Sequence, residues 1–505
     1  MKVEVAPLDI AIIILYLGGM AVLGVWFSKK NKTTEDYFLG GRSFPGWVIG
    51  LSMLGTSISS VTFLAFPAAA YTLDWRQLVS NLMLPFVAVL AIIVFIPFFR
   101  RGQATSAFEY LGERFGPGIR LYGTLSFILL QLIRIANVLF LVAIPVGLLT
   151  GLDIRLVIVL VGAFISLYTI AGGINAVIWT DVVQSVVLWL GGFVCFLTIV
   201  TRLPGGIGQI LEVGSQYHKF DVGSFGFNLD ERTFWTVAFL GVVSWLTMYS
   251  SDQNLVQRYL AAKNLKEARK ATTIYSAVAV PTWAFFFFLG TCVFVFYKVN
   301  PDPDVPPGAD AVFPYFILSQ VPAGVTGLVI SGVLAAAMSS LDSSINAIST
   351  IVTVDLMKPY LAKGRDDAFY LRWAKGVAVG ASVVMVIGAI GFSQVEKESM
   401  NDLNWIVASV FGGCLLGLFM VGFFTTRIGN KAALAGLCVA IILNVFLGFN
   451  AAGWLPGAMA IPVHSYWTGI LVNLCFLVVA WFVATLGRKQ GKTLTGLTIW
   501  TMKGR

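Results

Sequence analysis

The sequence predicts an all-α polytopic membrane protein, with about thirteen transmembrane helices in one domain over residues 1–505. Hydrophobic residues make up 57% of the chain and charged residues 12%. That charged fraction is about half that of an ordinary soluble domain. The mean hydropathy is +0.84. Apolar runs of about 20 residues, the length that crosses a bilayer, recur along the whole chain.

Each predicted span is an apolar run between polar loops. The first run lacks the basic start and the cleavage site of a signal peptide, so we expect it to remain as an extra N-terminal helix. The run at 311–349 is too long for one straight span and is expected to be tilted or broken. In order, the predicted spans are 8–28, 43–69, 77–99, 121–149, 155–171, 176–201, 233–251, 271–297, 311–349, 371–393, 402–425, 431–449 and 465–487.

The net charge of +9 is distributed in a way that orients the chain rather than binds nucleic acid. Basic residues lie in every second loop, whereas the intervening loops hold acids such as Asp302, Asp304 and Glu396. By the positive-inside rule, the N-terminus lies outside and the C-terminus in the cytoplasm. We expect a monomer in a bacterial inner membrane, with the lipid bilayer as its surroundings. The basic loop groups include Lys29, Lys30, Arg100, Arg101, Arg258, Lys263, Lys358, Lys363, Arg427 and Arg488.

Two predicted spans are interrupted by polar residues with weak helix propensity. The second carries the sequence GLSMLGTSISS at 50–60, and the seventh ends early at MYSSDQ, 248–253. Such backbone at membrane depth is tolerated where it lines a cavity or is buried in protein. Broken segments in corresponding positions indicate an inverted-repeat transporter with a site near the midplane. Close packing of small residues alone is the competing explanation.

This pattern divides the chain into two five-helix repeats with flanking helices. We expect the extra helix at 8–28, a first repeat over 43–201, a second repeat over 233–425 and two C-terminal helices over 431–487.

Several ionisable and hydroxyl groups lie inside the predicted spans. Asp181 and the run AAMSSLDSS at 336–344 place carboxylates and hydroxyls in apolar segments, where charge is costly and therefore functional by default. Oxygen ligands with one or two carboxylates suit a hard cation. Arg134 is the one base expected deep within a span, and its planar guanidinium suits a carboxylate. The alternatives are that the serines bond their own backbone and that the charged groups pair with one another or cap helices.

Other chemistry has little support in the sequence. All five cysteines fall in apolar segments without a CxxC pair, which argues against a disulfide framework or a zinc site. The longest polar stretches, about 202–232 and 354–370, are loop-sized, and the chain has two histidines. We therefore expect a protein that is not an enzyme.

Three further motifs resemble the sodium:solute symporter family over almost the whole chain. They are DYFLGGR at 36–42, NAVIWTDVVQ at 175–184 and QNLVQRYLAAK at 253–263. Within that family, the helix count, the second span and Arg134 are most similar to the bacterial sialic-acid/sodium symporters. The resemblance implies a LeuT-like 5+5 inverted repeat and alternating access, with one or two sodium ions as the coupling ions.

The resemblance also implies two sodium sites. The first would use the carbonyls of Gly55, Ile58 and Ala336 with the hydroxyls of Ser339 and Ser340. The second would use Asp181, Ser339, Asp342 and Ser343. Asp342 departs from the sialic-acid branch, which has serine there. Three roles for Asp342 are therefore open: it strengthens the sodium site, it makes the site proton-linked, or it contacts another partner.

The implied substrate site has Arg134 holding a carboxylate. Ser57, Ser59 and Thr62 on the broken helix, and Gln77 and Asn81 on the next, complete it. Three of these depart from the branch, in which threonine, phenylalanine and glutamine are expected in place of Ser57, Gln77 and Asn81. We also expect Trp245 and Tyr249 to be gate candidates, with packing as the alternative.

The function that these expectations indicate is sodium-coupled symport of a small anionic solute, a carboxylated sugar such as sialic acid. The alternative within transport is a sodium-coupled carrier of another monocarboxylate or of a neutral sugar. A channel would need ring-like filters, and a kinase-linked sensor would need a long cytoplasmic extension. Neither feature stands out in the sequence.

Overall fold

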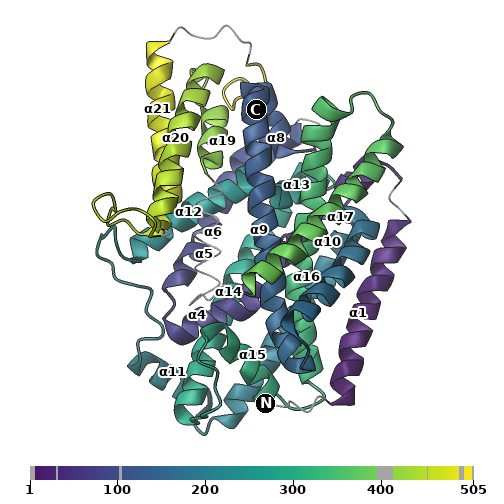
Figure 1. Cartoon of the computed structure of the whole chain (residues 1–505), viewed down its shortest axis with the longest axis vertical. Coiled ribbons are helices and arrows are strands. Elements are labelled where there is room, and N and C mark those ends of the chain that lie inside the picture. Colours follow the sequence, from purple (N-terminus) through teal and green to yellow (C-terminus); the bar gives the residue numbers. More distant parts are fainter. Residues whose placement is uncertain are drawn as a thin grey trace.

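The computed structural model describes residues 6–29, 32–101, 105–394, 413–451, 453–487 and 494–502. Within these ranges the chain is helical, and its one β-type contact is an isolated bridge between Phe44 and Ala262. The longer helices cross the molecule side by side, with short helices at their ends (Figure 1). The α-helices are α1 (Pro7–Ser28), α2 (Thr34–Leu39), α3 (Gly46–Ser57), α4 (Phe66–Thr72), α5 (Val79–Leu82), α6 (Leu84–Leu90), α7 (Ile96–Arg101), α8 (Ala107–Phe115), α9 (Pro117–Thr150), α10 (Ile154–Arg202), α11 (Gly206–Gln216), α12 (Phe234–Ser251), α13 (Gln253–Ala261), α14 (Leu265–Val299), α15 (Ala309–Gln320), α16 (Thr326–Ile351), α17 (Asp367–Phe392), α19 (Leu415–Phe424), α20 (Asn430–Ala451) and α21 (Thr468–Leu486).

The helices long and apolar enough to cross a membrane match the predicted spans closely. Ten helices in the described part of the chain pass this test, and one bent pair raises the number to eleven. The over-long run at 311–349 is divided into α15 and α16, as expected. The predicted span 402–425 lies partly outside the described residues, and α19 is its described end.

The 49 residues of α10 are two predicted spans joined end to end. Gly173, which lies between the predicted spans 155–171 and 176–201, has φ +56° and ψ −165° and bends the helix there. A side chain at this position would also be crowded, because a Cβ atom would lie 2.7 Å from Cδ2 of Tyr37. A glycine tolerates both constraints, so the chain can turn between two spans without a loop.

Both predicted helix breaks are present. α3 ends at Ser57, Ile58 is extended with φ −95° and ψ 113°, and a π-helical turn, Val61–Ala65, leads into α4. The two arms of this span are bent by 61°. α12 ends at Ser251, and Asp252 adopts φ −77° and ψ 110° before α13 begins. The Asp252 carboxylate accepts a hydrogen bond from the Asn254 backbone N–H and thereby caps α13.

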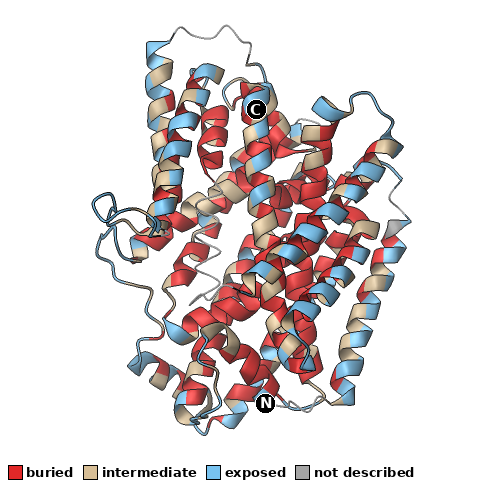
Figure 2. Cartoon of the chain, viewed as in Figure 1, coloured by how far each residue is buried: buried red, intermediate tan, exposed pale blue. Residues whose placement is uncertain are grey.

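α16 is the central helix of the molecule. In an apolar 18-residue stretch within Thr326–Leu361, which contains α16, 94% of residues are buried, against 17% in the corresponding stretch of α1. Figure 2 shows the same contrast between the buried interior and the exposed faces of the peripheral helices α1, α20 and α21. The serine-rich run at 336–344 therefore lies in the protein interior, away from lipid.

α1 is tied to the start of this central helix. Its Asp9 carboxylate accepts hydrogen bonds from the backbone N–H of Gly327 at 2.6 Å and of Gly324 at 3.1 Å. A carboxylate at a helix N-terminus satisfies free N–H groups and interacts favourably with the helix dipole. The extra helix thus anchors the end of α16.

Candidate functional site

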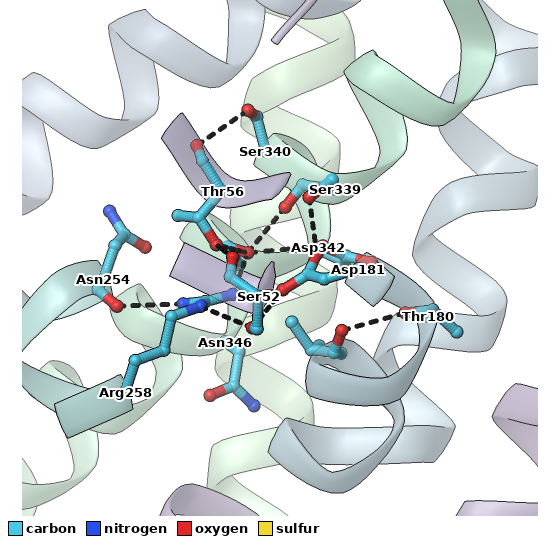
Figure 3. A network of polar contacts seen from close by, with 12 residues as sticks. Ser52, Thr56, Thr180, Asp181, Asn254, Arg258, Ser339, Ser340, Asp342 and Asn346 are labelled. Atoms are coloured by element: carbon cyan, nitrogen blue, oxygen red, sulfur yellow. Dashed lines mark hydrogen bonds and ion pairs between the residues drawn. The ribbon is translucent and has the colours of Figure 1, made fainter. Parts of the chain in front are cut away.

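The break after α3 lies directly against α16. The hydroxyl of Ser340 donates to the carbonyl of Thr56 at 3.1 Å, and the hydroxyls of Thr56 and Ser343 lie 3.2 Å apart. A Cβ atom on Gly55 would lie 2.8 Å from Oγ of Ser339, so a glycine permits this approach. The hydroxyl-rich face of α16 and the end of α3 therefore form one polar cluster in the interior (Figure 3).

Three of the residues predicted for the first sodium site, Gly55, Ser339 and Ser340, lie where α3 meets α16. The other two, Ile58 and Ala336, are buried within three residues of these positions along the chain. Carbonyls in the last turn of a helix have no intrahelical donor, so the extended residue Ile58 leaves oxygens free to act as ligands. Neutral carbonyl and hydroxyl oxygens are the donor set that suits a hard monovalent cation. A sodium ion at this cluster stays a prediction.

Asp181 adjoins this first cluster, and both of its carboxylate oxygens accept hydrogen bonds. One oxygen accepts from Ser339 at 2.5 Å, and the other from Ser52 at 2.5 Å. The guanidinium of Arg258 forms an ion pair with the same second oxygen at 2.8 Å. Both side chains of this pair are almost completely buried. The predicted partners Asp181 and Ser339 are therefore in contact, but a base that the sequence interpretation placed in a loop joins them.

Arg258 corrects the sequence interpretation, which assigned it to a basic loop. It lies on α13, inside the protein, where its guanidinium also donates to Ser343 at 2.6 Å and to Ser52 at 2.8 Å. At 1.5 Å per residue, a position six residues after Asp252 lies only about 9 Å along the helix from the break. That short distance from a midplane break was the signal that could have identified a second buried base.

Asp342 is buried on α16 and is not part of the lining of the cavity described below. Its carboxylate accepts a hydrogen bond from the Tyr168 hydroxyl of α10 at 2.9 Å, and Ser343 lies 3.5 Å away. Tyr16 of α1 reaches the same region and contacts the sulfur of Met338 at 3.8 Å. Asp181, Asp342 and Arg258 together bring two carboxyl groups and one guanidinium into a small volume. Two carboxylates so close repel each other, so the group either holds a cation or keeps one carboxyl protonated.

Arg134 of α9 faces a cavity of about 210 Å³ between the two helix breaks. The guanidinium is partly accessible, lies 3.4 Å from the Thr56 carbonyl, and is 4.0 Å from Oδ2 of Asp252. A pair with an acid of another helix was the alternative to substrate contact, and Asp252 is that acid. At 4.0 Å, however, the two groups do not form the short bidentate contact that an arginine makes with a tightly held carboxylate.

Five of the six predicted substrate residues line this cavity, and one does not. The remaining wall includes aromatic and aliphatic side chains, as is usual for small-molecule sites. Gln77 is buried outside the lining. The predicted lining residues that face the cavity are Ser57, Ser59, Thr62, Asn81 and Arg134.

Asn81 is a polar residue of this wall with an unused hydrogen-bond donor. Among the described residues, its amide nitrogen is one of the buried atoms without a hydrogen-bond partner. A buried donor without a partner is costly, so a ligand oxygen is the natural complement. Ser57, in contrast, is already bonded to the Tyr275 hydroxyl at 2.7 Å.

The two gate candidates differ in position. Trp245 lines the cavity, donates from its indole nitrogen to the Ser80 carbonyl at 3.0 Å and packs against Trp283. Tyr249 is fully buried and is not part of the lining. The last helix also contributes, because Asn473 and Gly469 of α21 face the cavity, which the sequence did not predict.

A family model and individual relatives both place this chain in one protein family. The model of the sodium:solute symporter family matches residues 37–440. The sodium/sialic acid symporter SiaT of Proteus mirabilis is 33% identical over 438 residues, covering 86% of this chain and 88% of that protein. The sodium/sialic acid symporter NanT of Aliivibrio fischeri is 32% identical over 476 residues, covering 93% and 92%.

Solved structures agree with the sequence relatives. A substrate-bound, outward-open Na⁺-coupled sialic acid symporter superposes with a TM-score of 0.87 at 30% identity, covering 96% of this chain and 99% of that one. A nucleobase-cation-symport-1 family transporter, at 16% identity and a TM-score of 0.59, shares the fold. The predicted LeuT-like fold class is confirmed.

Proposed function

Because this chain belongs to the sodium:solute symporter family, we propose that it couples the entry of sodium to the import of a carboxylated sugar of the sialic acid class. It is a multi-pass membrane protein, and the substrate would bind among the polar groups in its interior. The relatives named for sodium and sialic acid transport support both the coupling ion and the substrate.

The observation that carries the proposal is the position of Arg134. Its guanidinium is exposed to a cavity between two helix breaks, and its nearest acid is 4.0 Å away. A cation in a low-dielectric site attracts an anionic ligand, and the guanidinium fork matches a carboxylate. Asn81 supplies a donor for a hydroxyl or amide oxygen of the same ligand. Apolar and aromatic residues such as Phe66 and Trp283 complete the wall.

Charge balance links the substrate to the first sodium ion. The first cation cluster consists of neutral oxygens, whereas the cavity holds one guanidinium and one carboxylate, Arg134 and Asp252. A sodium ion at the cluster adds a positive charge a short distance from the cavity, and a monoanionic substrate neutralises it. Each ligand therefore improves the site for the other, which is the thermodynamic condition for coupling.

Transport then follows alternating access. Sodium bound between α3 and α16 orders the break beside the cavity, and the substrate carboxylate binds Arg134 next. Closure over the loaded cavity and rocking of one five-helix half against the other expose both ligands to the cytoplasm. We assign the N-terminus to the outside and the C-terminus to the cytoplasm of a bacterial inner membrane. Labelling of an introduced cysteine at Gly364 by an impermeant reagent from the cytoplasmic side alone would test this orientation.

The defining experiment is uptake of labelled N-acetylneuraminate into proteoliposomes. An inward sodium gradient should drive accumulation, and replacement of sodium by potassium should abolish it. Absence of uptake, from protein that sodium still stabilises in a thermal melt, would contradict the substrate while retaining the coupling ion. Competition by other monocarboxylates would then identify the cargo, since Arg134 recognises the carboxylate that they share.

A further inference from the structure

Asp252 has a place in the cavity that its role as a helix cap does not explain. Its Oδ1 accepts the Asn254 backbone N–H at 2.8 Å and caps α13. Its Oδ2 is directed elsewhere, lying 3.4 Å from the amide nitrogen of Gln131 and 4.0 Å from Nη1 of Arg134. A cap needs one oxygen, so the second oxygen is available for a different task.

The contact between Asp252 and Arg134 is loose and partly open to the cavity. Both residues belong to the cavity wall, and their side chains retain 12% and 22% exposure. Charge-assisted pairs that are held tightly have N–O distances near 2.8 Å, as Arg258 and Asp181 do in this same protein. Two ion pairs of the same chemical type thus differ in length, and the longer one faces the cavity.

We propose that Asp252 is a resident counter-ion of Arg134 that the substrate carboxylate displaces, so that Asp252 sets the affinity and selectivity for anionic substrates. This inference rests on the proposed function, because it takes Arg134 as the carboxylate site. The displaced carboxylate is not left without partners, since Gln131 and the Asn254 backbone N–H still donate to it.

The displacement has two consequences for recognition. An anion that binds Arg134 must compete with Asp252, so its apparent affinity is lower than the affinity of an isolated guanidinium. A neutral analogue gains nothing from Arg134 and meets no such competition. Asp252 therefore weakens carboxylates selectively and keeps the empty site close to electroneutral.

The test is the Asp252→Asn variant, because asparagine is an equally good helix cap and removes the negative charge at nearly constant size. The KM for N-acetylneuraminate should fall about two- to fivefold, which is the range expected for a partly exposed ion pair. The inhibition constant of the neutral methyl ester of N-acetylneuraminate should stay unchanged. In an Arg134→Ala background, Asp252→Asn should have no effect on KM.

Asp153→Asn is the matched control, because Asp153 caps the exposed start of α10 and lies outside the cavity wall. An unchanged or higher KM for the acid would overturn the proposal, as would an equal shift for acid and ester. A KM effect of Asp252→Asn that persists without Arg134 would overturn it as well.

A wrong substrate assignment can be distinguished from a wrong role for Asp252. If the wild-type protein does not transport N-acetylneuraminate, lactate and its neutral counterpart lactamide are compared by thermal-shift titration. A larger lactate shift in Asp252→Asn than in wild type, without a change for lactamide, would support the counter-ion role. Equal lactate shifts in the two proteins would refute it.

Discussion

At the scale of single residues, the two breaks and α16 bring together charged groups that are far apart in sequence. These groups differ in how closely each is paired with an opposite charge. Asp181 and Arg258 are fully buried and paired, whereas Arg134 is only loosely paired and faces the cavity. Breaking the first kind of pair is destabilising, because it leaves an uncompensated buried charge. Altering the second kind should change ligand binding with little effect on folding.

Replacing Arg134 by alanine should raise the KM for the anionic substrate by about tenfold to a hundredfold, the range for a lost charge-assisted hydrogen bond. Arg134→Lys should recover part of this, because it keeps the charge but not the planar fork. Arg155→Ala, on the exposed start of α10, is the control and should behave as wild type. Sodium-driven uptake measures all three, and unchanged substrate affinity in Arg134→Ala would refute the carboxylate contact.

Replacing Ser340 by alanine should raise the sodium concentration for half-maximal uptake by about two- to tenfold, because one hydroxyl ligand is lost. Ser382→Ala removes another buried hydroxyl, which bonds the Ala378 carbonyl of its own helix, and should leave sodium dependence unchanged. A sodium dependence in Ser340→Ala that matches the control would place the ion elsewhere.

The sequence identified some of these residues and missed others for a physical reason. Arg134 stood out because a lone base in an apolar span needs a special explanation. Arg258 did not, because its burial depends on Asp181, which is distant in sequence and belongs to another helix. The absence of Gln77 from the cavity lining depends on how the short helical segment Arg76–Leu78 packs, which the sequence pattern does not indicate.

At the scale of elements, the helices were predictable and their contacts were not. Apolar runs of bilayer length predicted the spans, and polar residues with weak helix propensity inside two of those runs predicted the breaks. The same reasoning placed a boundary between 171 and 176, where Gly173 bends α10. That both halves of α10 pack against α16 and carry Tyr168 and Asp181 to it follows only from the tertiary arrangement.

Substituting Gly173 by alanine should lower stability by about 1–3 kcal/mol, because the backbone is left-handed and a Cβ would clash with Tyr37. Gly18→Ala is the matched control, since a Cβ there meets nothing within 4 Å and alanine favours the helix. Thermal unfolding in detergent measures both variants. A Gly173→Ala protein as stable as the control would show that the bend does not require glycine.

At the scale of the whole molecule, the distribution of charge predicts how transport responds to voltage. The neutral cluster takes one sodium ion that the substrate anion balances. With Asp342 ionised, the group of Asp181, Asp342 and Arg258 carries one negative charge that suits a second cation. In that case we expect a net charge of about +1 to enter with each monoanion, and 100 mV to contribute about 2.3 kcal/mol to accumulation.

A potassium diffusion potential set with valinomycin measures this directly in proteoliposomes. An inside-negative potential should increase the sodium-driven accumulation of the labelled substrate, and an inside-positive potential should reduce it. Accumulation that does not depend on the potential would mean one sodium ion per monoanion, with no second cation beside Asp342.

The anchoring of α16 by Asp9 also sets an order in time. The carboxylate and the Gly324 N–H that it accepts are 315 residues apart in the chain. At a synthesis rate of about 5–20 residues per second, α1 exists for about 15 to 60 s before that partner is made. During that interval α1 sits in the membrane with an acid that has no helix to cap. α1 is therefore inserted well before it can make this contact, and its docking marks the assembly of the central helix.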